Sequence, residues 1–228
     1  MIVTFHLWGV PSRRVPAAFA AMARERRPLQ SQPGLTFAKL LGTGSGETFG
    51  WRDADVHHWA VLACWSSPEA AAAFDGSDVV RRFDARSHER LKVVLEPLTS
   101  KGSWSGRAPF EQARRDEPYT GPVAALTRAR IRPTRWREFW RSVPPVSDEL
   151  ARAEGLRLRL GIGEAPVGLQ GTFSIWRSHE DLIAFAYRAA AHQQVVRRTR
   201  ERGWYAEELF TRFAVLDVEG TYQGVTPP

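Results

Sequence analysis

Segments in which apolar and polar residues alternate are separated by segments whose apolar residues lie three and four positions apart. Alternation predicts strands, and the wider spacing predicts helices. In the first part of the chain the predicted strands are 2–9, 34–42, 57–65 and 90–98, and the predicted helices are 13–27 and 68–85. Ser12 is expected to cap the first helix, and Ser66 or Ser67 the second. This β-α-β-β-α-β order is that of a ferredoxin-like module.

The same order returns after a polar connector at about 105–121. Its predicted strands are 122–131, 155–162, 169–176 and 208–218, and its helices are 134–143 and a long helix that begins after Ser178. Trp65 matches Trp176, and Phe74 matches Phe185. We therefore expect an α+β fold, in which a tandem duplication of ferredoxin-like β-α-β-β-α-β modules forms a fused dimeric α+β barrel. The expected modules are 1–105, without a cofactor, and 106–228, and they should fold as one cooperative unit because each sheet must cover the other.

The long helix places one histidine on an apolar stripe. The stripe consists of Leu182, Phe185, Ala189, His192 and Val196. Between the matched phenylalanine and the following VVRR motif, the first half has four residues, 75–78, and the second half has nine, 186–194. His192 lies within these additional residues. Two interpretations of His192 stay open. It is either a buried histidine that is hydrogen-bonded to a carbonyl group, or a ligating or catalytic residue that only the second half contains.

Composition excludes several classes of protein. Cys64 is the single cysteine among 228 residues, so an intrachain disulfide and a cysteine-based zinc site are excluded. No apolar run approaches the roughly 20 residues of a membrane-spanning helix, and we expect a cytoplasmic protein, with peripheral membrane contact left open. The net charge of +7 suits an anionic ligand or surface. An RRM signature is absent, so no nucleic-acid partner is expected.

Several segments resemble the spheroidene monooxygenases, the carotenoid ketolases of purple bacteria. They are LLGTGSGETF at 40–49, WAVLACW at 59–65, KGSW at 101–104, GPVAALTRARIRP at 121–133, GIGEAP at 161–166, TFSIW at 172–176 and the segment from His192 to Phe213, which ends in WYAEELFTRF. The resemblance implies a haem-dependent monooxygenase that uses dioxygen and external electrons to oxygenate an apolar, carotenoid-like substrate. Fold relatives bind haem in the C-terminal half through a helix histidine. Here that residue would be His192, as the iron ligand of one haem b.

Further site residues follow from what a bound haem requires: basic groups for its propionates, a distal donor and apolar walls. Arg128 and Arg159 are candidates for polarising iron-bound oxygen or holding a propionate. The alternative for such strand arginines is an ion pair with a carboxylate such as Glu164. The apolar walls are assigned to Phe173, Trp176 and Phe185, for which packing in the core is the alternative.

Two other activities fit the same scaffold. One is a haem-dependent lyase of the aldoxime-dehydratase type, acting on an N-hydroxylated small molecule, and the other is a cofactor-free monooxygenase. The expected partners of the oxygenase are an apolar small molecule, dioxygen and an external electron donor. Homodimer formation is left open by the sequence.

Overall fold

The computed structural model describes residues 1–45, 53–112, 117–135, 149–150, 152–164, 171–188 and 203–227. Eight strands close a barrel in the order β1-β3-β2-β6-β7-β5-β8-β4, in which all pairs are antiparallel. The chain passes twice through the predicted strand order, and each pass supplies four neighbouring strands. We call β4-β1-β3-β2 the first sheet and β6-β7-β5-β8 the second sheet. The predicted fold, a fused dimeric α+β barrel, is confirmed.

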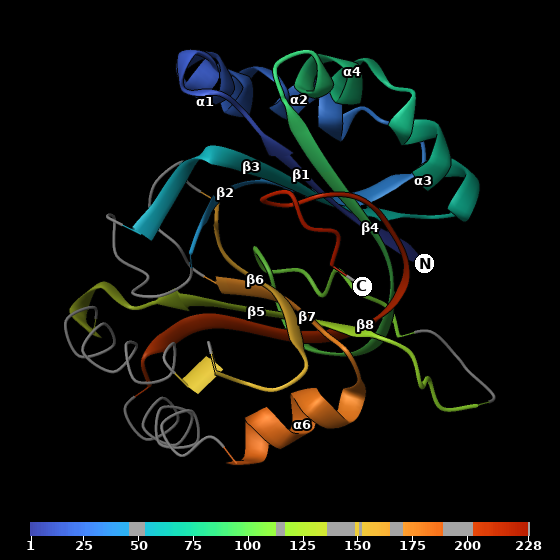
Figure 1. The fold of residues 1–228 in the computed structure, drawn as a ribbon, viewed down its shortest axis with the longest axis vertical. Helices are drawn as coiled ribbons and strands as arrows, with labels where there is room; N and C mark the ends of the chain where they lie inside the picture. Colours follow the sequence, from blue (N-terminus) through green and yellow to red (C-terminus); the bar gives the residue numbers. More distant parts are fainter. Residues whose placement is uncertain are drawn as a thin grey trace.

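Four layers are visible in Figure 1: helices α1 to α4, the first sheet, the second sheet and α6. The elements of the first half are β1 Ile2–Gly9, η1 Ser12–Arg14, α1 Val15–Arg24, α2 Arg26–Gln30, β2 Leu35–Gly44, β3 Ala54–Trp65, α3 Pro68–Asp75, α4 Asp78–Asp84 and β4 Glu89–Gly102. Those of the second half are β5 Val123–Ile131, η3 Pro133–Arg135, β6 Leu156–Gly163, β7 Gly171–Trp176, α6 His179–Arg188 and β8 Tyr205–Gly220. Most of the helix predicted at 134–143 lies outside the described residues.

The capping predictions had different outcomes. The Ser67 hydroxyl accepts a hydrogen bond from the Ala70 amide at 3.2 Å, as expected of an N-cap. The prediction for Ser12 was wrong, because the chain first makes a 3₁₀ turn and α1 begins only at Val15. The predicted helix 68–85 divides into α3 and α4, since Ser77 starts a second cap by accepting from the Val80 amide.

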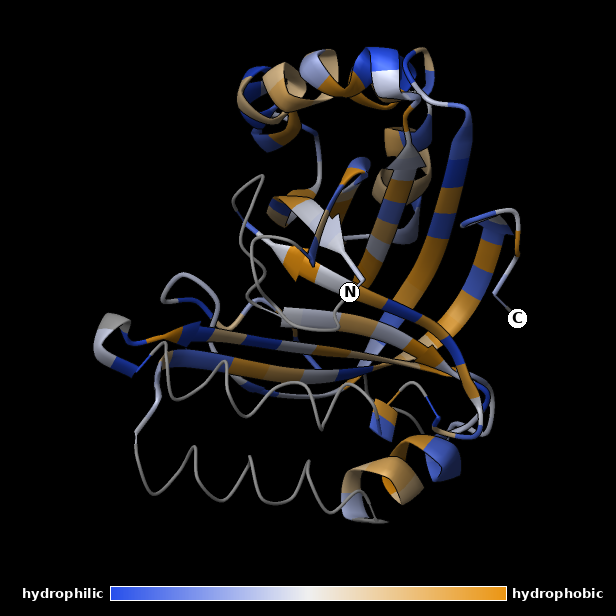
Figure 2. Ribbon diagram, turned by 60° about the vertical axis from the view of Figure 1, so that its left-hand side comes forward, coloured by the Kyte–Doolittle hydropathy of each residue, from blue (hydrophilic) through white to orange (hydrophobic). Residues whose placement is uncertain are grey.

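The barrel interior is filled, and most of the side chains in it are apolar. Successive residues of a strand point to opposite faces of the sheet, so each strand contributes every second residue to the interior. The alternation is visible as colour bands along the strands in Figure 2. Phe5 of the first sheet stacks on Phe173 of the second, with 4.1 Å between ring centroids and 12° between ring planes. The two inner faces therefore pack directly on each other.

The match between the two halves extends to side-chain packing. Trp65 lies 4.9 Å from Phe74, and Trp176 lies 5.4 Å from Phe185, both measured between ring centroids. Both pairs lie between a sheet and the helix that follows it, which confirms the predicted correspondence. We call the face of each sheet that meets the helices its outer face.

Two tight turns close the ends of the barrel. One turn follows β4 and is closed by a bridge between Trp104 and Arg107, and the other follows β8 and is closed by a bridge between Tyr222 and Val225. Each turn is held by a glutamate of the opposite half: Glu207 accepts from the Gly106 amide at 2.7 Å, and Glu89 accepts from the Gly224 amide at 2.8 Å. Both glycines have positive φ, 72° and 75°, which residues with a side chain rarely adopt. The predicted module boundary at 105 stays a prediction.

Candidate functional site on the outer face of the second sheet

Strand register arranges the outer face of the second sheet in rows, because directly paired residues share a face. One row has an arginine at each edge of the sheet and small residues between them. Across β8, β5, β7 and β6 this row, which we call the arginine row, is Arg212, Ala125, Ser174 and Arg159.

A second row lies beside the arginine row. Across the same strands this row, which we call the threonine row, is Phe210, Thr127, Thr172 and Gly161. Thr127 and Thr172 are only partly buried, although they occupy inner strands of the sheet. Phe210 is 40% exposed, although β8 is hydrogen-bonded on both sides. This part of the face is lined by small side chains and one accessible aromatic ring.

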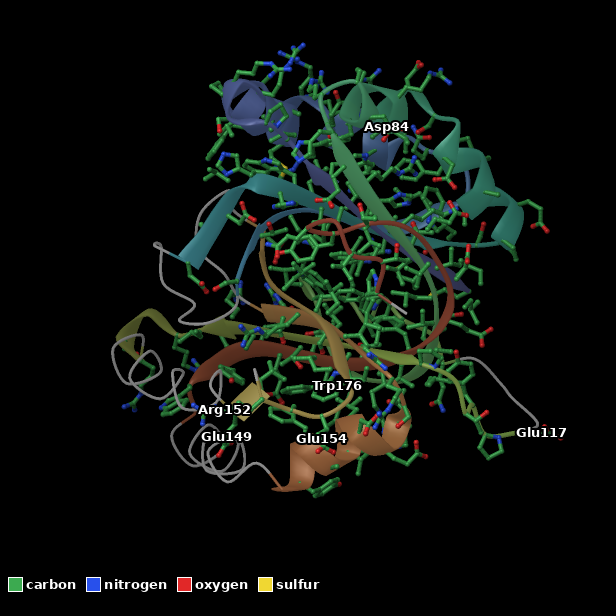
Figure 3. The ribbon with its side chains drawn as sticks, in the orientation of Figure 1. Asp84, Glu117, Glu149, Arg152, Glu154 and Trp176 are labelled. Carbon is green, nitrogen blue, oxygen red and sulfur yellow. The ribbon has the colours of Figure 1, made fainter. Side chains whose placement is uncertain are left out.

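One end of the face is closed by apolar side chains beneath α6. Trp176 is 1% exposed and packs with Val123, Leu182 and Phe185. Figure 3 shows Trp176 between the second sheet and α6. Ser178 caps α6 as predicted, because its hydroxyl accepts from the Asp181 amide at 3.2 Å. Trp176 and Phe185 therefore pack together on the outer face, and their assignment as walls of a pocket stays a prediction.

Arg212 is a partly buried cation of the arginine row. Its Nε donates to Thr99 Oγ1 at 2.9 Å, and its Nη1 lies 3.3 Å and 3.4 Å from the two ring nitrogens of His179 in the first turn of α6. Neither partner is a carboxylate.

Arg128 and Phe173 lie on the opposite, inner face. Arg128 is 4% exposed, donates to Glu164 at 2.8 Å and pairs with Glu207. The ion pair with Glu164, left open by the sequence as the alternative for Arg128, is thus present. A ligand on the outer face cannot contact Arg128 or Phe173 without passing through the sheet.

The carboxylates around Arg128 belong to a connected network. Glu164 also accepts from Lys39 Nζ at 2.6 Å and from Trp104 Nε1 at 2.7 Å. Burial opposes ionisation of Glu207, but hydrogen bonds from the Gly106 amide and from Arg128 lower its pKa to about 2. The network therefore holds the strand ends at this end of the barrel in a charged, hydrogen-bonded state.

His192, the predicted iron ligand, lies outside the described residues, as do Ala189 and Val196 of the predicted stripe. Cys64 points into the barrel interior, where burial raises its pKa to about 12. Its thiol is therefore protonated at neutral pH and unsuited to act as a thiolate ligand. Within the described part of the chain, no three His, Cys, Asp or Glu side chains are placed to hold a metal ion.

Sequence analysis missed Arg212 and Phe210. The signal is in WYAEELFTRF, where Phe210 and Arg212 alternate with Leu209, Thr211 and Phe213. In a strand, alternate residues lie on opposite faces, and Leu209 and Phe213 are expected to point into the barrel. Phe210 and Arg212 then lie on the outer face, beside the small residues of β5.

Sequence comparison finds three similar curated proteins, all named spheroidene monooxygenase. The spheroidene monooxygenase of Rhodobacter capsulatus is 37% identical over 219 residues, which cover 93% of this chain and 89% of the relative. The chain belongs to the spheroidene monooxygenase family. The enzyme of the same name from Rubrivivax gelatinosus is 38% identical over 86% of this chain and 75% of the relative. The predicted resemblance is confirmed, and it identifies the chain as an oxidoreductase of the monooxygenase class.

Structure comparison agrees with the fold. A crystal structure of an aldoxime dehydratase in complex with butyraldoxime aligns with a TM-score of 0.63 at 10% identity, over 96% of this chain and 81% of that chain. At this identity the likeness concerns the fold alone. No family model matches the chain. Among the described residues, no helix is long and apolar enough to cross a membrane.

Proposed function

We propose that the chain is a haem b-dependent monooxygenase that oxygenates a carotenoid or a similar apolar polyene. The observation that carries the proposal is 37% identity to a spheroidene monooxygenase over 93% of the chain. The outer face of the second sheet supports it, because this face combines small side chains, an accessible aromatic ring and cations at its edges. These are properties that a flat, largely apolar group with two carboxylates requires.

The residues present fit a haem on this face. Thr127, Thr172 and Gly161 offer a shallow floor, on which a macrocycle would replace the bulky side chains that usually fill the space between a sheet and a helix. Trp176 and Phe185 give apolar contact at one end. His192 follows Phe185 by seven positions, a spacing that keeps two residues on the same face of a helix. We assign His192 as the iron ligand from the sequence.

When bound, haem would supply an iron centre for the reaction of dioxygen with external electrons. Each round would insert one oxygen atom into a C–H bond and reduce the other to water, consuming two electrons and two protons. The side chains of this chain would position the bound group and shield it from water. Phe210 and Thr127 would contact the bound group, and Trp176 and Phe185 would exclude water from one side of the site.

The inner position of Arg128 changes the assignment of a distal donor. Because Arg128 lies in the barrel between two carboxylates, we propose that it stabilises the scaffold and that any basic residue in contact with the haem comes from the outer face. Arg159 and Arg212 are the residues of the arginine row that meet this condition.

A spectrum of the purified protein tests the cofactor. We expect one haem per chain with a Soret band, and we expect His192→Ala to lose most of this haem because the iron loses its protein ligand. His88→Ala is the matched control, since His88 is an exposed histidine of the first half. An unchanged haem content in His192→Ala would exclude His192 as the ligand.

Labelled dioxygen distinguishes the activities that the sequence leaves open. The reduced protein is incubated with carotenoid under ¹⁸O₂, and the product is examined by mass spectrometry. Label in the product of the haem-containing protein supports the proposal. Turnover that needs no oxygen would favour a lyase, and label incorporated by haem-free protein would favour a cofactor-free monooxygenase.

A further inference from the structure

Arg212 differs from Arg90 and Arg128 of the strands, because neither of its partners is a carboxylate. Its described contacts are the Thr99 hydroxyl and the His179 imidazole, and it forms no ion pair with any residue in the described part of the chain. Arg128, by contrast, pairs with two carboxylates. Arginines that are withdrawn from water are normally matched by an anion. The guanidinium of Arg212 is therefore suited to an anion that the described residues do not supply there.

The position of Arg212 identifies the side from which that anion comes. Arg212 shares the outer face with its pairing partner Ala125, and neighbouring strands are about 4.8 Å apart. Beside Arg212 the row continues with the short side chain of Ala125, and the indole of Trp176 reaches the row only at Ser174, to which its Nε1 donates at 2.9 Å. The next row holds the partly exposed Thr127 and Phe210, on which the proposed haem would rest.

We infer that Arg212 binds a carboxylate of the haem. The chemistry is that of a charge-assisted hydrogen bond between a guanidinium and a carboxylate, for which the planar donor geometry of arginine is well suited. Thr99 and His179 fix the side chain from the side of β4 and α6, so that little conformational freedom is lost on binding. Arg212 is a binding residue, and the inference rests on the proposed function.

Arg159, at the other edge of the row, is the comparison. It lies close enough to Tyr222 for its charge to oppose the rise of that tyrosine's pKa, which burial and then Asp55 and Glu89 raise to about 12. The charge of Arg159 thus interacts with Tyr222 in the turn after β8, and not only with groups of the arginine row. Arg212 is the residue that the described contacts tie to the outer face alone.

The experiment compares two ligands that differ only in the carboxylates. The full-length protein, prepared without haem, is titrated with haemin and with haemin dimethyl ester, and each affinity is measured from the Soret absorbance. The wild-type protein should prefer haemin by about tenfold or more, the size expected for one charge-assisted hydrogen bond. Arg212→Gln should lose most of that preference, and Arg212→Lys should keep part of it. Arg130→Gln, at an exposed strand arginine, should behave as wild type.

The outcomes separate the inference from the function on which it rests. A wild-type protein that binds neither ligand overturns both. Binding of haemin and its ester with equal affinity overturns the carboxylate contact and leaves the haem in place. Retention of the full preference in Arg212→Gln overturns the role of Arg212. If Arg212→Gln does not fold, the wild-type preference and Arg212→Lys decide, since the lysine variant keeps the charge and the preference must then survive in part.

Discussion

The outer faces of the two sheets have the same backbone register and opposite side-chain content. Trp65 pairs with Ile2 as Trp176 pairs with Val123, so Thr4, His6 and Trp8 of β1 correspond to Ala125, Thr127 and Ala129 of β5. The three residues of β1 are all fully buried. On the neighbouring strands Leu40 corresponds to Gly161 by the same count. One face is filled by its own side chains, and the other is lined by short ones.

On the filled face of the first sheet, side chains of the chain itself occupy the space between the sheet and the helices. Trp8 stacks on Phe83 with 4.6 Å between centroids, and its Nε1 donates to Asp84 at 2.7 Å. His6 stacks on Trp8, and burial, followed by the charge of Arg90, lowers its pKa to about 3. A buried histidine in this half is therefore a neutral packing residue. The two copies of a duplicated scaffold thus differ at corresponding outward positions, where bulky side chains fill the first copy and short ones line the second.

Filling the outer face of the second sheet should have the largest effect on haem affinity. Thr127→Trp places a ring at the centre of the threonine row, much as Trp8 and His6 fill the first half. Overpacking costs about 1 to 3 kcal/mol even where neighbours adjust, so we expect haem affinity to fall by about fivefold to more than a hundredfold. Soret titration measures the affinity, and urea unfolding of the haem-free protein measures the accompanying change in stability.

Thr127→Val is the control for Thr127→Trp. Valine keeps the shape and removes only the hydroxyl, so haem affinity should change little. Equal haem binding by the tryptophan variant and the wild-type protein would contradict the placement of haem on the outer face.

Removing Arg128 should lower the stability of the fold and leave the preference for haemin over its dimethyl ester unchanged. Arg128→Met leaves the carboxylates of Glu164 and Glu207 without their shared cation, and breaking a buried ion pair from one side costs about 3 to 5 kcal/mol. Lys39 still neutralises Glu164, which places the expected loss near the lower value. Urea unfolding should show a lower midpoint with an unchanged slope.

The pH dependence of the Arg128 variant supplies a second measurement. The pKa of Glu207 is lowered in the folded protein, so its contribution to stability is present above its ordinary pKa and is lost as the pH falls toward about 2. The stability difference between Arg128→Met and wild type should therefore shrink on acidification. Arg130→Met is the control at neutral pH, and an equal loss in both variants would argue against a special role for the buried pair.

The fold could be predicted from the sequence because several independent patterns in the sequence specify the same fold. Alternation locates the strands, the two matched aromatic pairs align the halves, and ferredoxin-like order leaves few ways to close the sheets. Helix ends were less predictable. The break between α3 and α4 depends on Ser77 as a second cap, and the delayed start of α1 depends on a 3₁₀ turn at Ser12 that a serine alone does not indicate.

The candidate site was predicted only in part, because residue type does not specify the direction of a side chain. Phe173 and Trp176 are three positions apart on one strand and therefore face opposite sides, which the sequence already implied. Which side holds the site depends on the pairing of β5 with β7 and β8. Arginine is a residue type that often binds ligands, and only the strand register shows that Arg128 lies between Glu164 and Glu207.

The two ends of the barrel give a second comparison. At one end Glu207 holds the turn after β4 and is neutralised by Arg128, and at the other Glu89 holds the turn after β8 and faces His58 at 3.4 Å. The remaining ring nitrogen of His58 lies 2.6 Å from Asp55. An arginine stays charged throughout the physiological range, whereas a histidine does not. Only the end with His58 should respond to mild alkali.

The smallest expected effect comes from His58→Gln. Burial disfavours the charged ring, but the hydrogen bond and charge of Asp55, and then those of Glu89, raise the pKa of His58 above its ordinary value. A group with a raised folded pKa contributes stability that is complete below the unfolded pKa and disappears as the pH rises through the folded pKa.

At about pH 6, near the ordinary histidine pKa, we expect His58→Gln to be less stable than wild type by about 1 to 2 kcal/mol, the size of a hydrogen bond to a charged group. At alkaline pH the gap should narrow, since the wild-type ring loses its proton as the pH rises through the raised folded pKa. Urea unfolding at both pH values measures it, with Arg128→Met as the variant whose deficit stays constant over this interval. A His58→Gln deficit of equal size at both pH values would mean that the imidazole acts by packing against Tyr222, 5.0 Å away between ring centroids, and not by its charge.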